Sequence, residues 1–180
     1  QAIDGLNLES ASVYLIDNLI GSVTNLAEGD YTFSSIEAVF TNRFEVVFVE
    51  PVLFTTWDGS SWSPWTPNNT RTAVIAGDYN SCLTGLDIDA FALTVESGHT
   101  LTICAGNYLN VENDITINGN LIINHEGSVV QSDASAVTIN NGSISVEKIT
   151  PNIADTGFTI LGSPMTGETR GGVYVNAAIV

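Results

Sequence analysis

Short apolar runs separated by turn residues dominate the chain from residue 91 onward. Three apolar–Thr–apolar triplets recur every 22 residues: Leu93-Thr94-Val95, Ile115-Thr116-Ile117 and Val137-Thr138-Ile139. A repeat of about 20 residues built from strand-like runs is typical of a parallel β-solenoid, in which each coil buries its apolar side chains against the next coil. The pattern therefore predicts a small parallel β-helix over residues 72–150.

The triplets also predict one outward column of hydroxyl groups. Neighbouring residues of a strand point to opposite faces, so an apolar interior leaves Thr94, Thr116 and Thr138 outside. Thr72 would extend this column by one coil. Such a column raises an ice-binding alternative. Ice-binding solenoids usually present two adjacent threonine columns, however, and here only Thr100-Leu101-Thr102 has that form and does not repeat.

Glycines punctuate the repeat and mark the expected corners of the coils. We expect them to adopt a positive φ, which glycine tolerates better than other residues. The corner glycines are Gly98, Gly106, Gly119, Gly127 and Gly142.

Residues 1–50 carry a different pattern. Strand-like runs occur at Val13-Tyr14-Leu15-Ile16, at Tyr31-Thr32-Phe33 and from Phe44 to Val49, with Gly21 and Asn25 among the turn residues between them. Three or four strands do not close a sandwich alone. We therefore expect residues 1–50 to be a β-sandwich (Ig-like) portion, the tail of a larger module.

Residues 51–71 separate the two parts and contain all three tryptophans, Trp57, Trp62 and Trp65. The stretch is rich in proline and turn residues, which disfavour a regular sheet. A solenoid has an open end that needs a cap, and bulky aromatic side chains suit that role. The alternative is a carbohydrate-binding site in which the three flat indoles stack on sugar rings.

After Pro151 the repeat ends, and residues 151–180 are expected to be a β-strand cap or the start of the next module. The final residues form a strand-like run without a stop signal, and the chain starts at Gln1 as if it had been processed. We interpret the sequence as a piece of a longer polypeptide. It contains no signal peptide pattern.

The two cysteines, Cys82 and Cys104, are separated by the same 22 residues as the triplets. If the coils stack in register, one sulfur lies above the other, since stacked strands are about 4.8 Å apart and a disulfide tolerates that separation. We predict a disulfide; the alternative is a pair of buried free thiols. A disulfide would imply an oxidising, extracellular location.

The chain is strongly acidic, with a formal net charge of −16 from twenty acidic and four basic residues among 180. This charge repels phosphate backbones and anionic membrane surfaces, so we expect no nucleic-acid partner. No apolar run reaches the length of about 18 residues needed to insert into a membrane.

No catalytic constellation is recognisable, and we expect the chain not to be an enzyme. Asp87-Ile88-Asp89 places two carboxylates on one strand face, a weak candidate for a polysaccharide lyase or hydrolase. The same two residues are weak candidate calcium ligands, although known calcium-loop spacings are absent. We expect no cofactor and no other metal site.

Two sets of motifs carry a resemblance to known modules. The first set is Val13-Tyr14-Leu15-Ile16-Asp17-Asn18, Tyr31-Thr32-Phe33 and Asn42-Arg43-Phe44. The second is Thr55-Thr56-Trp57-Asp58-Gly59-Ser60-Ser61-Trp62 and Gly98-His99-Thr100-Leu101-Thr102-Ile103. Together they resemble the β-sandwich and β-solenoid modules of large exported surface proteins of the Bacteroidota.

The resemblance implies export by the type IX secretion system and an adhesive or scaffolding role at the cell surface. The partners it implies are other modules of the same polypeptide, neighbouring subunits and surface glycans. The sequence therefore predicts a non-catalytic structural or adhesive segment of a secreted or cell-surface protein or filament.

Overall fold

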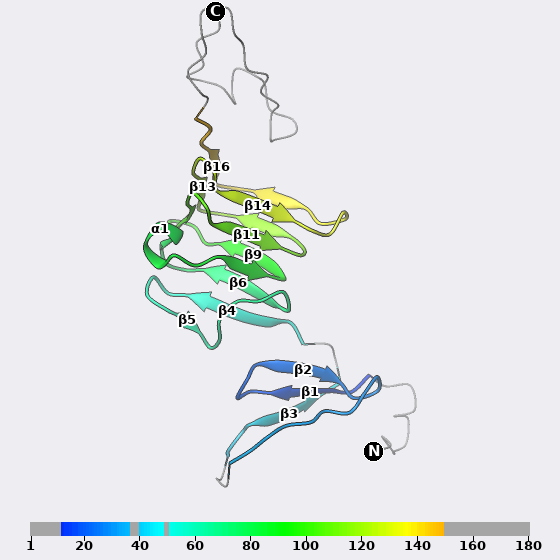
Figure 1. Ribbon diagram of the computed structural model, residues 1–180. Helices are drawn as coiled ribbons and strands as arrows, with labels where there is room; N and C mark the ends of the chain where they lie inside the picture. Colours follow the sequence, from blue (N-terminus) through cyan, green and yellow to red (C-terminus); the bar gives the residue numbers. More distant parts are fainter. Residues whose placement is uncertain (1–11, 37–39, 49–50, 150–180) are drawn as a thin grey trace, which may run out of the picture. The chain divides into compact units, whose positions relative to one another are not determined.

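The computed structural model describes residues 12–36, 40–48 and 51–149 (Figure 1). The chain divides into two compact units, Gln1–Lys148 and Ile149–Val180. The cap or module expected at residues 151–180 lies outside the described residues. The described residues form strands and one short helix, α1 (Ser81–Thr84), so the prediction of an all-β chain is confirmed.

The strands of the described residues form one antiparallel sheet and three sheets of a solenoid. Their bounds are β1 (Tyr14–Asp17), β2 (Ser22–Asn25), β3 (Phe44–Val47), β4 (Leu53–Trp57), β5 (Trp62–Ser63), β6 (Arg71–Ile75), β7 (Tyr79–Asn80), β8 (Ile88–Ala90), β9 (Ala92–Val95), β10 (Thr100–Ile103), β11 (Tyr108–Val111), β12 (Ile115–Ile117), β13 (Asn120–Ile123), β14 (Ser128–Gln131), β15 (Thr138–Asn140) and β16 (Ser143–Val146).

The first sheet has three antiparallel strands in the order β2-β1-β3. The predicted strands at β1 and β3 are confirmed, but Tyr31-Thr32-Phe33 is not a strand. The missed strand is β2, which follows β1 after a tight turn at Gly21, where φ is +62°. A positive φ suits glycine, and the turn allows the Val-Thr pair of β2 to extend against β1. The described residues thus contain a single layer of three strands.

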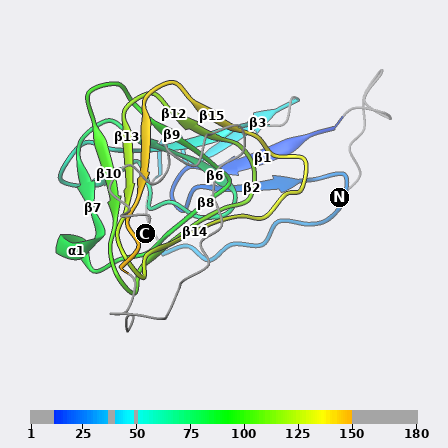
Figure 2. The same cartoon turned by 90° about the horizontal axis from the view of Figure 1, so that it is seen from above.

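From β4 onward, parallel strands wind into a β-solenoid of about five turns, so the predicted solenoid is confirmed. Three sheets form its sides, with the strand orders β5-β4-β6-β9-β12-β15, β7-β10-β13-β16 and β8-β11-β14. Figure 2 shows the coils superimposed along the winding axis. Each strand pairs with the equivalent strand of the next coil, which is how a coil satisfies its backbone groups.

The length of the coils is less regular than the triplets suggest. Leu93 pairs with Ile115, which confirms the separation of 22 residues for these two coils. The separation is 20 between Ala73 and Leu93, and 23 between Ile115 and Thr138. The corners therefore absorb one to three residues while the strands stay in contact.

One consequence is that the predicted threonine column is wrong at its last member. Thr94 pairs with Thr116 as expected, but Thr116 pairs with Ile139 instead of Thr138. One additional residue in the corner before β15 shifts the register by one position, and a shift by one exchanges the two faces of a strand. Thr72 also lies outside the column, because it pairs with Ala92.

The interior of the solenoid is a continuous column of aliphatic side chains. Strands of the middle coils alternate buried and half-buried residues, as expected for one face inside and one outside. The side chains with at most 1% exposure include Ile75, Ile88, Leu93, Val95, Leu101, Ile103, Leu109, Val111 and Ile117.

The solenoid begins at β4, earlier than the predicted residue 72, because β4 pairs in parallel with β6. The short strand β5 then folds back antiparallel on the outer edge of β4, where Trp57 pairs with Trp62. Trp57 packs edge-on against Tyr79, with 5.0 Å between ring centroids, and Trp62 lies 5.6 Å from Trp57. The tryptophan stretch therefore covers a strand edge and the adjoining end of the core.

At the other end, the interior rows become polar. Gln131 pairs with Val111, and Thr138 pairs with Ile115, so both occupy rows that are apolar in the preceding coil. The Gln131 amide accepts a hydrogen bond from Thr138 Oγ1 (3.1 Å) and donates one to the carbonyl of Val137 (3.1 Å). The last described coil thus closes its β14–β15 corner with polar groups.

Two of the corner glycines have the expected positive φ, +84° at Gly98 and +78° at Gly106. Gly119 and Gly142 are needed for a different reason, which is the close approach of neighbouring coils. A Cβ atom on Gly119 would collide with the carbonyl oxygens of Glu96 and His99, and one on Gly142 would collide with the carbonyl of Gly119.

We therefore expect Gly119→Ala to destabilise the solenoid by about 2 kcal/mol, because backbone atoms of two coils must move apart. Gly29→Ala is the matched control, since no atom lies within 4 Å of the added methyl group. Urea unfolding of both variants measures the difference. Equal unfolding midpoints for the two would contradict the close approach.

Candidate functional site

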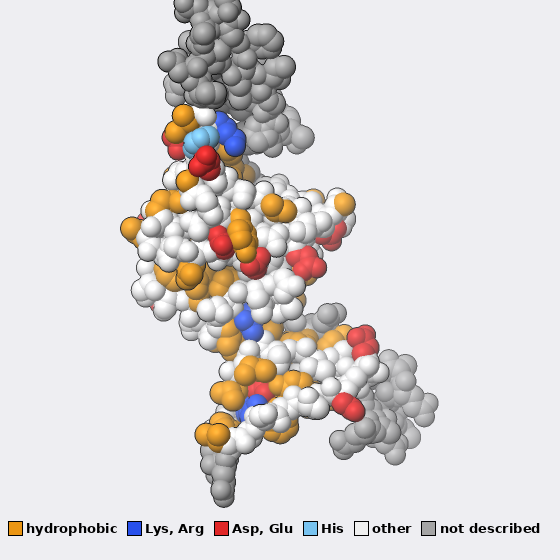
Figure 3. Space-filling view, in the orientation of Figure 1, with side chains coloured by type: hydrophobic (Ala, Val, Ile, Leu, Met, Phe, Trp, Pro, Cys, Tyr) orange, Lys and Arg blue, Asp and Glu red, His pale blue; other side chains and the backbone are white. Residues whose placement is uncertain are grey.

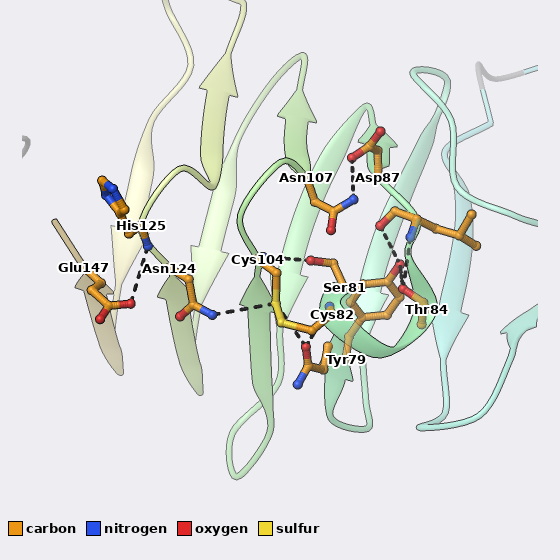
Figure 4. Close-up of a disulfide and its surroundings, with 12 residues drawn as sticks. Tyr79, Ser81, Cys82, Thr84, Asp87, Cys104, Asn107, Asn124, His125 and Glu147 are labelled. Carbon is orange, nitrogen blue, oxygen red and sulfur yellow. Dashed lines mark hydrogen bonds between the residues drawn. A yellow bond between two sulfur atoms is a disulfide. The ribbon is translucent and has the colours of Figure 1, made fainter. Parts of the chain in front are cut away.

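The disulfide between Cys82 and Cys104 is confirmed, with the two Cα atoms 5.4 Å apart (Figure 4). Cys82 lies in the exposed helix α1, which follows β7, whereas Cys104 follows β10 and is 5% exposed. β7 and β10 are neighbours in one sheet. The bond therefore joins two successive coils at a corner.

The corner that carries Cys82 is held at both ends. Asn80 precedes α1 and its side chain accepts a hydrogen bond from the backbone N–H of Cys82 (2.9 Å), as an N-cap residue does. The Tyr79 hydroxyl donates to the carbonyl of Leu86 (3.2 Å) and contacts Thr84 Oγ1 (3.0 Å). Burial raises the pKa of Tyr79, so its hydroxyl stays protonated and available as a donor.

Carboxylates on the coil surface accept hydrogen bonds from the backbone of the following coil. These are the bonds from the N–H of Thr100 to Asp78 (2.8 Å), of Tyr108 to Asp87 (2.9 Å) and of Val137 to Asp114 (2.9 Å). We call them cross-coil bonds. Each occupies a backbone donor at the start of a strand or just before it, so these three acidic residues stabilise the stacking of the coils.

Asp87 and Asp89, the carboxylate pair considered for catalysis or calcium, lie on the outer face of β8 and next to it. Asp87 also accepts from Asn107 Nδ2 (3.2 Å), and Asp89 accepts from Asn110 Nδ2 (3.1 Å) and the Tyr108 hydroxyl (3.4 Å). The negative charge of Asp89 raises the pKa of Tyr108. Both carboxylates therefore have partners on the neighbouring strand.

Within the described parts of the chain, no group of three or more His, Cys, Asp or Glu side chains converges as metal ligands would. The chemistry available at Asp87 and Asp89 is acceptance of hydrogen bonds from neutral donors.

The three tryptophans do not form one platform. Trp57 is only 9% exposed and donates its indole N–H to the carbonyl of Asp78 (3.0 Å), so its faces are not available to a sugar. Trp62 is half-buried against the core. Trp65 is also half-buried and lies beneath the Arg71 guanidinium, 5.2 Å from the ring centroid.

The outer face of the sheet that contains β9 and β12 carries Thr94 and Thr116, both half-buried. Their row continues to Val74 in one direction and to Ile139 in the other. The row thus mixes hydroxyl and aliphatic side chains, and it does not form the pair of threonine columns that the ice-binding alternative requires.

A buried ion pair in the three-stranded sheet was not predicted. Asp17 is fully buried, and Arg43 Nη2 lies 2.8 Å from its Oδ2. The Tyr31 hydroxyl (2.8 Å) and the N–H of Leu19 (2.9 Å) donate to the same carboxylate. The signal available in the sequence was that Arg43 is one of only four basic residues and follows a strand-like run that contains Asp17.

Hydrogen bonding from Arg43 is the largest cause that lowers the pKa of Asp17, to about 2 from the usual 3.8. A carboxyl with a lowered folded-state pKa stabilises the fold above its unfolded-state pKa, and this contribution disappears as the pH falls through its folded-state pKa. We therefore expect the three-stranded sheet to lose stability between about pH 4 and pH 2.

An acid titration followed by the NMR signals of Tyr31 and the solenoid residues checks this expectation. The control is Asp17→Asn, which lacks the titrating carboxyl and should lose its residual sheet stability without that transition. A sheet that titrates identically with and without Asp17 would contradict it.

No helix among the described residues is long and apolar enough to cross a membrane. No curated protein and no solved structure matches the chain. A family model described as "Domain of unknown function (DUF8693)" matches residues 53–178, and its first residue is also the first residue of β4. The family unit thus begins with the solenoid and leaves out the three-stranded sheet. Because the match covers well over half of the sequence, the chain belongs to the DUF8693 family.

Proposed function

We propose that the chain is a non-catalytic structural segment of a secreted or cell-surface multidomain protein or filament. The observation that carries this proposal is the use of the surface carboxylates. Asp78, Asp87 and Asp114 each hold the backbone of the next coil. A catalytic or metal site needs carboxylates that converge on a common point and retain free oxygens. Here the acidic side chains instead reinforce a stack of coils.

An oxidising compartment is supported by the Cys82–Cys104 disulfide, because such bonds persist mainly outside the cytoplasm. We propose an extracellular or cell-surface location on this ground. The resemblance to exported surface proteins of the Bacteroidota adds the type IX secretion route and an adhesive role to the proposal.

We further propose that the three-stranded sheet is one layer of an Ig-like β-sandwich. The proposal is supported by the apolar side chains on one face of β3, where Phe44 is 40% and Val46 is 52% exposed. A sheet buries its apolar face against a second layer in stable domains. The partner of a sandwich layer is therefore a second sheet with an apolar face.

Single-molecule pulling from the two ends tests the structural role. We expect the solenoid to resist extension, and the oxidised chain to withhold the 22 residues between its cysteines, about 75 Å of extended length. Reduction should release that length. A chain that extends at forces typical of unstructured polypeptide would contradict a load-bearing role.

A glycan array separates the structural proposal from the carbohydrate-binding alternative. We expect no binding that depends on the tryptophan stretch. Binding that Trp62→Ala abolishes, with the fold retained by circular dichroism, would favour the carbohydrate-binding module instead.

A further inference from the structure

Four phenylalanines and a valine lie exposed together on the three-stranded sheet. Phe44 and Val46 are on the same face of β3, and the alternation of the strand places Phe48 on that face as well. Phe33 packs on Phe44 with 4.7 Å between ring centroids. We call these residues, together with Phe40, the aromatic face: Phe33, Phe40, Phe44, Val46 and Phe48. Figure 3 shows hydrophobic side chains gathered at the surface of this part of the chain.

The aromatic face is largely accessible, because its members are between 40% and 59% exposed. A fully accessible aromatic side chain offers about 200 Å², so the four rings present about 400 Å² to solvent. Patches of this size on a soluble protein usually mark an interaction site.

A hollow at one end of the aromatic face can receive a side chain. Its lining includes Phe33, Phe40, Arg43 and Phe44, and its volume is about 380 Å³. A dry cavity of about 150 Å³ already holds a benzene molecule, so a phenylalanine ring fits here. The Arg43 guanidinium lies 4.8 Å from the ring centroids of both Phe33 and Phe44 and forms part of the wall.

The aromatic face carries no net charge in an otherwise acidic chain. The positive charge of Arg43 is neutralised by the buried Asp17. The formal net charge of the chain is −16, so two copies repel each other over most of their surfaces. The aromatic face is therefore a place where a second copy can approach without direct contact between like charges.

We propose that two copies of this chain associate through their aromatic faces, so that two three-stranded sheets form one β-sandwich across a two-fold axis. In an antiparallel arrangement, Phe48 at one end of β3 lies over the partner's hollow at the other end of β3, about 14 Å away along the strand. The symmetry makes the same contact twice. This inference rests on the sandwich layer proposed above.

Contact between the rings alone buries about 800 Å² over both copies, which is the size of a weak, transient interface. Sedimentation velocity of the intact oxidised chain over a range of concentrations should therefore show a reversible monomer–dimer equilibrium. Because the copies are both acidic, added sodium chloride should strengthen the dimer.

Phe48→Ser should weaken dimerisation by more than about tenfold, as expected when an interface loses an aromatic anchor. Leu83→Ser is the matched control: Leu83 is 85% exposed but lies on α1, so this variant should dimerise normally. Circular dichroism checks that both variants remain folded.

A chain that stays monomeric at every concentration overturns the dimer, and so does a dimer that is lost in Leu83→Ser but kept in Phe48→Ser. A monomer whose aromatic face binds a hydrophobic dye in a Phe48-dependent way leaves the sandwich layer intact and assigns its partner to another polypeptide. The failure of the dimer is thus distinguishable from the failure of the sandwich.

Discussion

Replacing Leu101 by alanine is expected to lower the free energy of unfolding of the solenoid by about 4 kcal/mol. Leu101 is fully buried in β10, where it stacks between Tyr79 of the preceding coil and Leu121 of the following coil. The loss combines the transfer free energy of the missing atoms with the cost of a cavity that strand pairing on both sides keeps open.

The measurement is urea denaturation of the oxidised protein, followed by tryptophan fluorescence, since Trp57 and Trp62 lie against the core. Leu83→Ala is the matched control, because Leu83 is exposed and its truncation should change stability by less than about 0.5 kcal/mol. Similar losses for both leucines would mean that Leu101 does not belong to a continuous interior column.

Removing the disulfide should have the second largest effect. Without the Cys82–Cys104 bond, the unfolded chain regains the conformational freedom of a 22-residue loop. A loop of this length corresponds to about 3 kcal/mol in the chain-entropy description, so Cys82→Ser/Cys104→Ser should unfold at a lower temperature and a lower urea concentration.

Reductant provides the internal control for this variant. Cys82 is exposed, so a phosphine reductant should reach the bond and shift the unfolding of the unmodified chain toward that of the double variant. The same reductant should leave the double variant unchanged. An unmodified chain that is insensitive to reductant, with both thiols nevertheless alkylated, would show that the bond contributes nothing to stability.

The architecture of the solenoid was predictable because it depends on a periodic signal. The spacing of Leu93 and Ile115 identifies neighbouring coils, and the spacing of the two cysteines identifies a bond between coils. Each of these inferences needs only that the strands stack, and stacking tolerates corners of different length.

The finer register was less predictable, because it depends on single residues in the corners. Thr138 was placed on the outside by counting from Thr116, but an additional corner residue brings Ile139 into that row. Sequence patterns do not distinguish a corner of one length from a corner one residue longer when both contain glycine or polar residues.

The polar contacts of the candidate site were beyond the reach of a sequence reading for a similar reason. Asp17 and Arg43 are 26 residues apart and meet only because β1 pairs with β3. Asp87 looks like one half of a carboxylate pair in the sequence, and its function as an acceptor for Tyr108 depends on the register of β8 and β11. Such roles follow from the pairing of strands and not from local composition.

The polar ending of the interior rows at Gln131 and Thr138 bears on how the fold limits its own growth. Adding a rung of apolar residues beyond β14 and β15 would desolvate an amide and a hydroxyl group without giving them new partners. On these two sides the stack is therefore a poor seed for runaway, amyloid-like elongation. A protein exported at high local concentration benefits from an ordered stack that does not propagate.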